Sequence, residues 1–178
     1  MKIQYIVGNL LTTDCYHILQ GCNAQGAMGS GVAKVIFDVY PMVREDYIAL
    51  SSTRKLVLGE VQYVDVPPVT ISDIQYPARC VINGITQEYY AKHGDDPNTV
   101  YVSYDAIADV AQHVSDMILQ EYEVTETFKP RVALPLIGAG LARGDWSLIA
   151  TLIEDLSGDI WQPVVYVQTQ EQLDSILK

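Results

Sequence analysis

The chain has 178 residues, 49% of them hydrophobic, which suits one globular domain with a single core, so we expect residues 1–178 to form one domain. Its formal net charge of −11 argues against generic nucleic-acid binding and against binding to anionic membranes, because both depend on Lys and Arg meeting phosphates. No apolar run is long enough to cross a bilayer, and residues 1–5 enter a strand pattern without the apolar core of a signal peptide, so we expect a cytoplasmic protein.

The first predicted element is a weakly alternating strand at residues 3–7, which ends at Gly8 and Asn9. A short connector follows at residues 10–14, and a second strand is predicted at residues 16–20. This strand leads into residues 20–34, which contain four glycines and turn into a helical pattern that runs to about Val39. Pro41 ends this helix and opens the next, at residues 41–50, because proline disfavours helical geometry in the residue before it and suits the first helical position.

Residues 20–34, which we call the first glycine loop, have the arrangement strand, loop, helix start. Glycines let main-chain N–H groups approach an anion without a Cβ in the way, and the following helix adds unpaired N–H groups and the positive end of its dipole. The segment therefore predicts a phosphate site. The alternative interpretation is a tight turn between strand and helix that touches no ligand.

The middle of the chain continues to alternate between strands and helices. Clean period-two alternation predicts a half-buried strand at residues 60–66, and a further strand is predicted at residues 80–86. Gly84 interrupts that second strand and indicates a bulge or a close approach. Residues 93–98 have loop composition, and a long helical pattern that starts at Thr99 or Ser103 predicts an amphipathic helix over one face of the sheet.

A second glycine loop, residues 137–144, follows a predicted strand at residues 131–136 and carries Gly138 and Gly140. A helix at residues 146–156, a strand at residues 163–168 and a helix at residues 171–177 complete the chain. Strands that alternate with helices imply a mostly parallel or mixed sheet with helices on both faces. Two glycine loops at the carboxyl ends of parallel strands face each other across a crevice, so together they predict a site that grips a diphosphate from both sides.

The cysteines and His17 indicate no disulfide framework, metal site or other functional site in the sequence. Cys15, Cys22 and Cys80 lack any Cys-x-x-Cys or His partner spacing, so reduced thiols are expected and neither a disulfide framework nor a zinc site is indicated. His17 alternates on a predicted strand and is expected in the core.

Several motifs, taken in this order, resemble those of a macro domain. They are Gly8-Asn9-Leu10, Gly21 to Gly26, Met28 to Ala33, Ile137 to Leu141, and Asp145-Trp146. The resemblance spans nearly the whole chain and is greatest to the small stand-alone macro domains, phage ones included, that act as ADP-ribose-1″-phosphate phosphatases. It implies an α/β fold, a three-layer α/β/α sandwich with a mixed, mostly parallel central sheet, whose cleft binds ADP-ribose.

The resemblance also implies roles for individual residues. Asn23 is expected to orient the distal ribose and Asp145 to activate water, so these two are the predicted catalytic residues. The predicted ligand-binding residues are Asn9, Leu10, Gly21, Asn23, Gly26, Ala27, Met28, Gly29, Ser30, Gly31, Val32, Ile137, Gly138, Ala139, Gly140 and Leu141. Each catalytic candidate has a structural alternative: Asn23 is a turn residue that bonds its own backbone, and Asp145 caps a helix.

The partner implied is ADP-ribose or ADP-ribose-1″-phosphate, with no metal and no cofactor, in the cytoplasm (the host cytoplasm if a phage encodes the chain). The oligomeric state does not follow from the sequence. An aromatic wall for adenine is available from six tyrosines: Tyr63, Tyr76, Tyr89, Tyr90, Tyr101 and Tyr104.

Three positions depart from the family's pattern. Asn9 stands where members usually have an Asp that accepts a hydrogen bond from the adenine amino group, and an Asn carbonyl accepts with less charge assistance. Gln20 stands at the place of a His that the phosphatases pair with the Asp, and Gln cannot act as a base or nucleophile. Sibling hydrolases use a Lys where this chain has Phe37, and Lys34, one turn earlier, is expected on a solvated helix face.

Three functions remain open at this stage. The first is an enzyme that removes the 1″-phosphate of ADP-ribose-1″-phosphate. The second is a module that binds ADP-ribose or a related NAD-derived nucleotide without chemistry, which the missing His and displaced Lys favour. The third is a hydrolase that releases ADP-ribose from modified macromolecules.

Overall fold

The computed structural model describes residues 2–27 and 29–177 and contains a six-stranded sheet. Its strands are β1 (Gln4–Val7), β2 (His17–Asn23), β3 (Val61–Val66), β6 (Arg79–Gln87), β7 (Arg131–Leu134) and β8 (Gln162–Val167). They lie in the order β1-β8-β7-β2-β6-β3, and neighbours run parallel except β3, which is antiparallel to β6. The mixed, mostly parallel sheet predicted from the sequence is confirmed.

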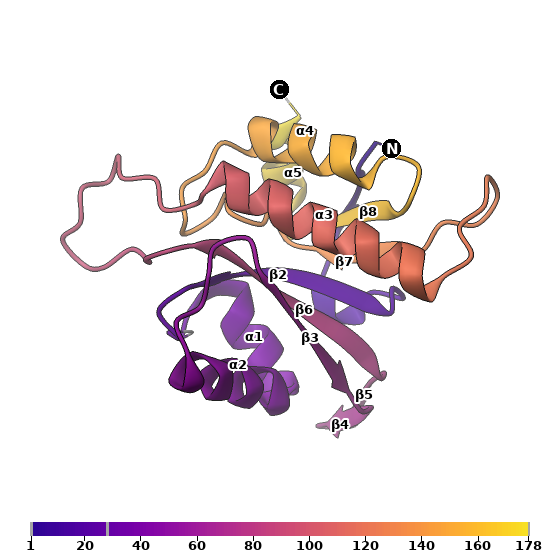
Figure 1. The fold of residues 1–178 in the computed structure, drawn as a ribbon, viewed down its shortest axis with the longest axis horizontal. Coiled ribbons are helices and arrows are strands. Elements are labelled where there is room, and N and C mark those ends of the chain that lie inside the picture. The colour runs from indigo at the N-terminus through magenta and orange to yellow at the C-terminus, as the bar shows by residue number, and fades with distance from the viewer. Residues whose placement is uncertain (1, 28, 178) are drawn as a thin grey trace.

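Helices cover both faces of this sheet. α1 (Gly31–Val39) and α2 (Pro41–Thr53) lie on one face, and α3 (Tyr104–Glu121), α4 (Trp146–Ser157) and α5 (Gln170–Ile176) lie on the other (Figure 1). A large apolar core between the sheet and α3 and α4 includes Ile107, Ile149 and Trp161, and smaller cores lie beneath α1 and α2. The predicted three-layer α/β/α sandwich is therefore present.

Local sequence explains where the helices begin. The side chains of Ser103, Asp145 and Thr169 each accept a hydrogen bond from a main-chain N–H in the first turn of α3, α4 and α5. Pro41 occupies the start of α2 and separates it from α1. These residues therefore fix the first turns of α2, α3, α4 and α5.

Three features lie beyond the sequence prediction. β2 continues as far as Asn23, where its register against β6 shifts, so the first glycine loop starts from a longer strand than expected. A 3-10 turn, η1 (Leu10–Thr12), occupies the predicted connector after β1. A short hairpin of β4 (Val69–Ile71) and β5 (Ile74–Tyr76) was not predicted.

Within residues 2–27 and 29–177, no helix combines the length and hydrophobicity needed to cross a membrane.

Candidate functional site

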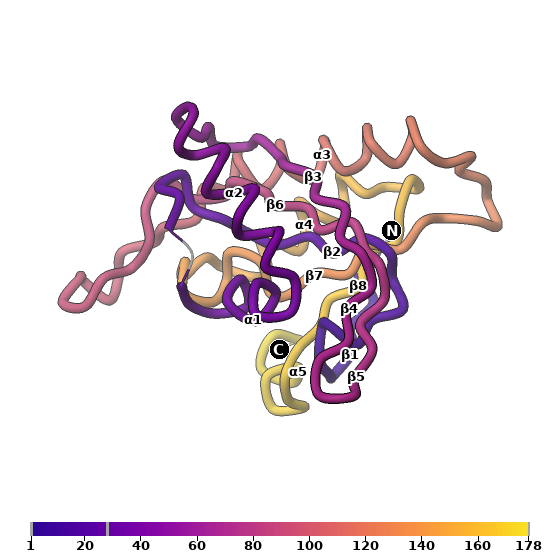
Figure 2. Tube along the Cα trace, turned by 90° about the horizontal axis from the view of Figure 1, so that it is seen from below, coloured from indigo at the N-terminus to yellow at the C-terminus, as the bar shows by residue number. Residues whose placement is uncertain are grey.

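A cavity of about 300 Å³ opens at the carboxyl ends of β2, β6, β7 and β8. The two glycine loops lie side by side at this edge of the sheet (Figure 2), and a Cβ placed on Gly31 would lie 3.5 Å from Leu141 Cδ1. Of the predicted ligand-binding residues, the cavity lining brings together Gly21, Asn23, Ala27, Ser30, Gly31, Val32, Ile137, Gly138, Gly140 and Leu141. The crevice expected between the two loops is therefore present.

The first glycine loop presents the start of α1 to the cavity. Ser30 is the N-cap residue in an extended conformation, and within the described part of the chain its hydroxyl makes no capping hydrogen bond. Ser30 and Gly31 both line the cavity, so the first N–H groups of this nine-residue helix lie at its wall. Unpaired N–H groups and the positive end of a helix dipole attract an anion.

The second glycine loop depends on Gly138 for its shape. Gly138 has φ +74°, and a Cβ there would lie 2.7 Å from Val102 Cγ2. The Gly144 N–H closes the loop by donating to the Gly138 carbonyl oxygen at 2.8 Å. Only glycine fits this position, because a side chain would meet both an unfavourable dihedral angle and a neighbouring side chain.

The cavity is uncharged, although the chain has a formal net charge of −11. Among the described residues that line it, none is Asp, Glu, Lys, Arg or His. Burial raises the pKa of the Cys22 thiol well above its ordinary value, so this lining residue is neutral as well. An anion in the cavity is therefore held by main-chain N–H, hydroxyl and amide groups.

Asn23 uses its side chain to shape the first glycine loop. Its Oδ1 accepts hydrogen bonds from the N–H groups of Gln25 and Ala27, at 3.0 and 3.2 Å, and from the Tyr47 hydroxyl at 3.2 Å. Its Nδ2 donates to the Ala27 carbonyl oxygen. These contacts match the structural alternative for Asn23, a turn residue that bonds the backbone of its own loop. Because Asn23 also lines the cavity, its contact with the distal ribose stays a prediction.

Asp145 is the N-cap residue of α4. Its Oδ1 accepts from the Ser147 N–H at 2.8 Å and from the Ser147 hydroxyl at 2.7 Å. The hydroxyl donation from Ser147 lowers the pKa of the Asp145 carboxyl, so the group is ionised at neutral pH. Asp145 lies outside the residues that line the cavity, and its contacts are those of the capping alternative. Its role in activating water stays a prediction.

The remaining predicted binding residues lie outside the cavity lining. They are Asn9, Leu10, Gly26, Gly29 and Ala139, whereas Met28 lies outside the described residues.

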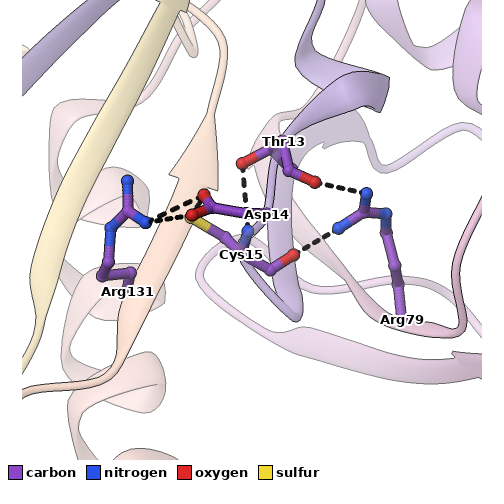
Figure 3. Close-up of polar contacts among 5 residues, drawn as sticks. All are labelled: Thr13, Asp14, Cys15, Arg79 and Arg131. Atoms are coloured by element: carbon purple, nitrogen blue, oxygen red, sulfur yellow. Dashed lines mark hydrogen bonds and ion pairs between the residues drawn. The ribbon is translucent and has the colours of Figure 1, made fainter.

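Two arginines hold the end of the connector that follows Asn9 (Figure 3). Arg79, only 1% exposed, donates to three main-chain carbonyl oxygens within residues 11–15, including that of Thr13 at 2.5 Å. Arg131 Nη1 lies 2.8 and 2.7 Å from the two carboxylate oxygens of Asp14. The turn after β1 is therefore fixed from both sides.

Sequence reasoning missed the two ends of the cavity. At one end, the lining residues are Tyr166 of β8, Gln168, and Gln172 of α5; at the other, they are Thr86 and Gln87 of β6, and Tyr90. Tyr90 was among the six tyrosines suggested for an aromatic wall, and Tyr166 was not. The sequence contained a signal that could have found these residues, because residues that follow parallel strands lie at the same edge of a sheet as the glycine loops.

The positions that depart from the family's pattern carry no basic side chain into the cavity. Gln20 Nε2 donates to Asn83 Oδ1 at 2.7 Å, so Gln20 lines the cavity as part of a neutral amide pair. Phe37 is buried, and Lys34 forms an exposed ion pair with Asp38 at 2.6 Å. The expected placement of Lys34 on a solvated helix face is confirmed.

No protein-family model matches the chain. An uncharacterised 17.5 kDa protein from the tk-vs intergenic region of Enterobacteria phage T4 is 24% identical over 173 residues, which cover 93% of this chain and 100% of the relative. A macrodomain protein from Streptomyces coelicolor is 25% identical, with a TM-score of 0.69 and coverage of 94% of this chain and 100% of the other.

Two further solved structures have the same architecture. The macrodomain of Mycobacterium tuberculosis DarG is 19% identical, with a TM-score of 0.71 and coverage of 94% and 98% of the two chains. Thermosipho africanus DarTG in complex with ADP-ribose is 14% identical, with a TM-score of 0.72 and coverage of 99% of this chain and 46% of the other. The sheet, the helices on its two faces and these likenesses together show that the chain has the macrodomain fold.

Proposed function

We propose that the cavity binds ADP-ribose, with the diphosphate between the two glycine loops. The observation that carries the proposal is that both loops meet over an uncharged cavity at the carboxyl ends of the strands. Main-chain N–H groups and a helix start suit a diphosphate there. The likeness to Thermosipho africanus DarTG, whose structure is a complex with ADP-ribose, supports this ligand class.

The two ends of the cavity differ in character, which orients the proposed ligand. At the β8 end, the lining residues Tyr166, Val32 and Ala33 are each partly buried against the same apolar core, and an apolar wall of this kind suits a flat base. At the β2 and β6 end, the lining is polar: Gln20, Asn23, Thr86 and Gln87. Amides and hydroxyls both donate and accept hydrogen bonds, as sugar hydroxyls require, so the distal ribose belongs at this end.

The reaction that we propose for this site is release of phosphate from ADP-ribose-1″-phosphate. Asp145 accepts a proton from water as the water attacks phosphorus, the bond from phosphorus to the ribose oxygen breaks, and the proton passes to that oxygen. The Ser147 hydroxyl lowers the pKa of Asp145, which keeps the carboxylate ionised but makes it a weak base. Slow turnover is therefore expected.

A binding module without chemistry is the second candidate. The specific observation that favours it is the uncharged cavity lining, which within the described residues holds no carboxylate, His or Lys to serve as a base. In that case Asp145 is only the cap of α4.

Binding is tested by calorimetric titration of ADP-ribose into the wild type, Gly140→Glu and Gly140→Gln. Gly140 lines the cavity, and a Cβ there meets nothing within 4 Å, so both variants are expected to fold. A carboxylate in the cavity repels the diphosphate, and we expect Gly140→Glu to weaken binding about tenfold more than the neutral Gly140→Gln. Absence of binding to the wild type would overturn the proposed function.

Chemistry is tested by phosphate release from ADP-ribose-1″-phosphate by the wild type and by Asp145→Asn. Asn is as good an N-cap residue as Asp, so this variant keeps the helix start and loses only the base. Release that disappears in Asp145→Asn, with ADP-ribose binding retained, would establish the phosphatase and the role of Asp145. Binding without release in either protein would overturn the phosphatase and leave the second candidate or a hydrolase of another ADP-ribose linkage.

A further inference from the structure

The second glycine loop offers a run of unpaired main-chain donors at the cavity. Gly140, Leu141 and Ala142 are consecutive in the chain, and all three line the cavity. In the part of the chain that the structure describes, none of their three N–H groups donates a hydrogen bond to the protein. Successive N–H groups in a turn form a site for an anion, so this run suits one phosphate of the proposed ligand.

Arg143 ends this run in an unfavourable main-chain conformation. Its φ of +59° lies in the left-handed region, which residues with a long side chain seldom adopt. Its N–H donates to the Gly140 carbonyl oxygen at 3.0 Å and so closes the turn that carries the run. A residue persists in such a conformation only where other contacts hold it there.

The Arg143 side chain makes contacts of this kind with the segment between β6 and α3, which projects beyond the sheet (Figure 1). Its Nη1 donates to the carbonyl oxygens of Asp96 and Thr99, at 2.6 and 3.3 Å. Its guanidinium lies 5.6 Å from the centre of the Tyr101 ring. The main chain adds a further link, since the Tyr101 N–H donates to the Ala142 carbonyl oxygen at 2.8 Å. Arg143 itself lies outside the cavity lining.

We propose that Arg143 is a positioning residue for the ADP-ribose site. It links the second glycine loop to residues 96–101 and thereby holds the loop in the conformation that presents the three N–H groups, while its own charge does not contact the ligand. This inference rests on the proposed binding of ADP-ribose. A loop that without the link adopts the binding conformation for about a tenth of the time lowers the affinity about tenfold.

Arg143→Asn tests the link by calorimetric titration of ADP-ribose into the full chain. Asn tolerates positive φ but is too short to make the contacts of the Arg143 side chain, so the turn still forms and is no longer held. We expect this variant to bind ADP-ribose about tenfold more weakly than the wild type. Wild-type affinity in Arg143→Asn would overturn the inference and leave the proposed function standing. Absence of binding to the wild type would overturn the proposed function itself.

A control variant separates positioning from direct attraction of the ligand. Lys129→Gln removes the same positive charge just before β7, at the edge of the sheet opposite the cavity, where Lys129 pairs with Asp159. At about 0.5 M salt, exposed charges are screened within a few ångströms, so we expect Lys129→Gln to match the wild type and Arg143→Asn to remain about tenfold weaker. A loss in Arg143→Asn that disappears at this salt concentration would overturn the inference, because the side chain would then act through its charge.

Tyr101→Leu tests the link from its other side. It removes the ring beside the guanidinium and keeps the main-chain hydrogen bond to Ala142. We expect about threefold weaker binding of ADP-ribose, as the loss of one cation–ring contact implies. The double variant with Arg143→Asn is expected to bind no more weakly than Arg143→Asn alone, because both substitutions break the same link. Losses that multiply would contradict the inference, and urea unfolding of each variant verifies that it is folded during the titration.

Discussion

His17, the first residue of β2, is buried between two aromatic rings and only 2% exposed. Its ring meets Tyr16 and Tyr122 edge to face, with centroid distances of 5.0 and 5.7 Å. Its Nε2 lies 3.9 Å from a Glu121 carboxylate oxygen, which is too far for a hydrogen bond. Burial lowers the pKa of His17 below its ordinary value of 6.5, although Asp65 opposes the shift. The expected core histidine is confirmed, and it is neutral at pH 7.

This histidine predicts a loss of stability in mild acid. Below pH 6.5 the unfolded chain protonates His17 while the folded chain resists, so the free energy of unfolding falls as the pH drops from 6.5 toward the folded pKa. One such proton gives a slope of at most about 1.4 kcal/mol per pH unit.

Urea unfolding of the wild type and His17→Gln at several pH values between about 5 and 7.5 measures this slope. The variant is expected to show a flatter dependence, and His113→Gln, at an exposed position on α3, is the matched control. Equal slopes in the wild type and His17→Gln would contradict the prediction.

At the scale of the elements, α3 rests on the centre of β6 through one glycine. A Cβ placed on Gly84 would lie 2.7 Å from Val110 Cγ1. β6 continues without a break from Arg79 to Gln87, so of the two alternatives raised by the sequence the close approach is confirmed. A helix and a strand that meet this closely leave no room for a methyl group.

We therefore expect Gly84→Ala to lower the free energy of unfolding by about 1–3 kcal/mol, through overpacking. Val110→Ala removes the obstructing methyl groups, so the double variant is expected to be more stable than the sum of the two single effects implies. Urea unfolding of the four proteins measures this coupling. Gly140→Ala, which meets nothing within 4 Å, is the control, and strictly additive effects would argue against the contact.

Most helices and strands could be predicted from the sequence because their signals are local. Periods of two and 3.6 residues mark the strands and helices, and Pro41, Ser103 and Asp145 mark helix starts. The β4–β5 hairpin escaped because strands of three residues show no period, and because its turn places Ser72 and Asp73 at positive φ without a glycine.

The residues of the candidate site likewise divide into those that could be predicted from local sequence signals and those that could not. The glycine loops were predictable because a glycine's effect on its own turn is local, as at Gly138. Tyr166 and Gln172 were not, because their place depends on which strands are neighbours, and the order of a sheet is set by contacts distant in the sequence. For Asp145, the capping alternative followed from its place before a helix, whereas its position outside the cavity lining depends on contacts distant in the sequence.

At the scale of the whole molecule, a chain with a net charge of −11 encloses a cavity whose described lining is uncharged. An anionic ligand therefore meets a repulsive field at long range and attractive N–H dipoles only at contact. Salt screens the long-range repulsion more than the attraction to the N–H dipoles at contact, because exposed charges are screened over about 10 Å at 0.1 M ionic strength.

The affinity for ADP-ribose is thus expected to rise with salt, by roughly two- to threefold between 0.01 and 0.15 M. A site built from Lys and Arg shows the opposite trend. Titrations at several salt concentrations measure the effect, with uncharged adenosine as the control ligand. Binding that weakens as salt is added would show that basic side chains such as Lys34 reach the ligand.

A binding site made of main-chain groups also affects which substitutions such a protein tolerates. The N–H groups at the start of α1 and in the second glycine loop belong to every amino acid except proline, so substitutions that spare the turns leave them in place. The macrodomain of Mycobacterium tuberculosis DarG keeps this architecture at 19% identity. A fold of this kind can carry many different side chains and still present the same donors, because the donors depend on where the chain turns.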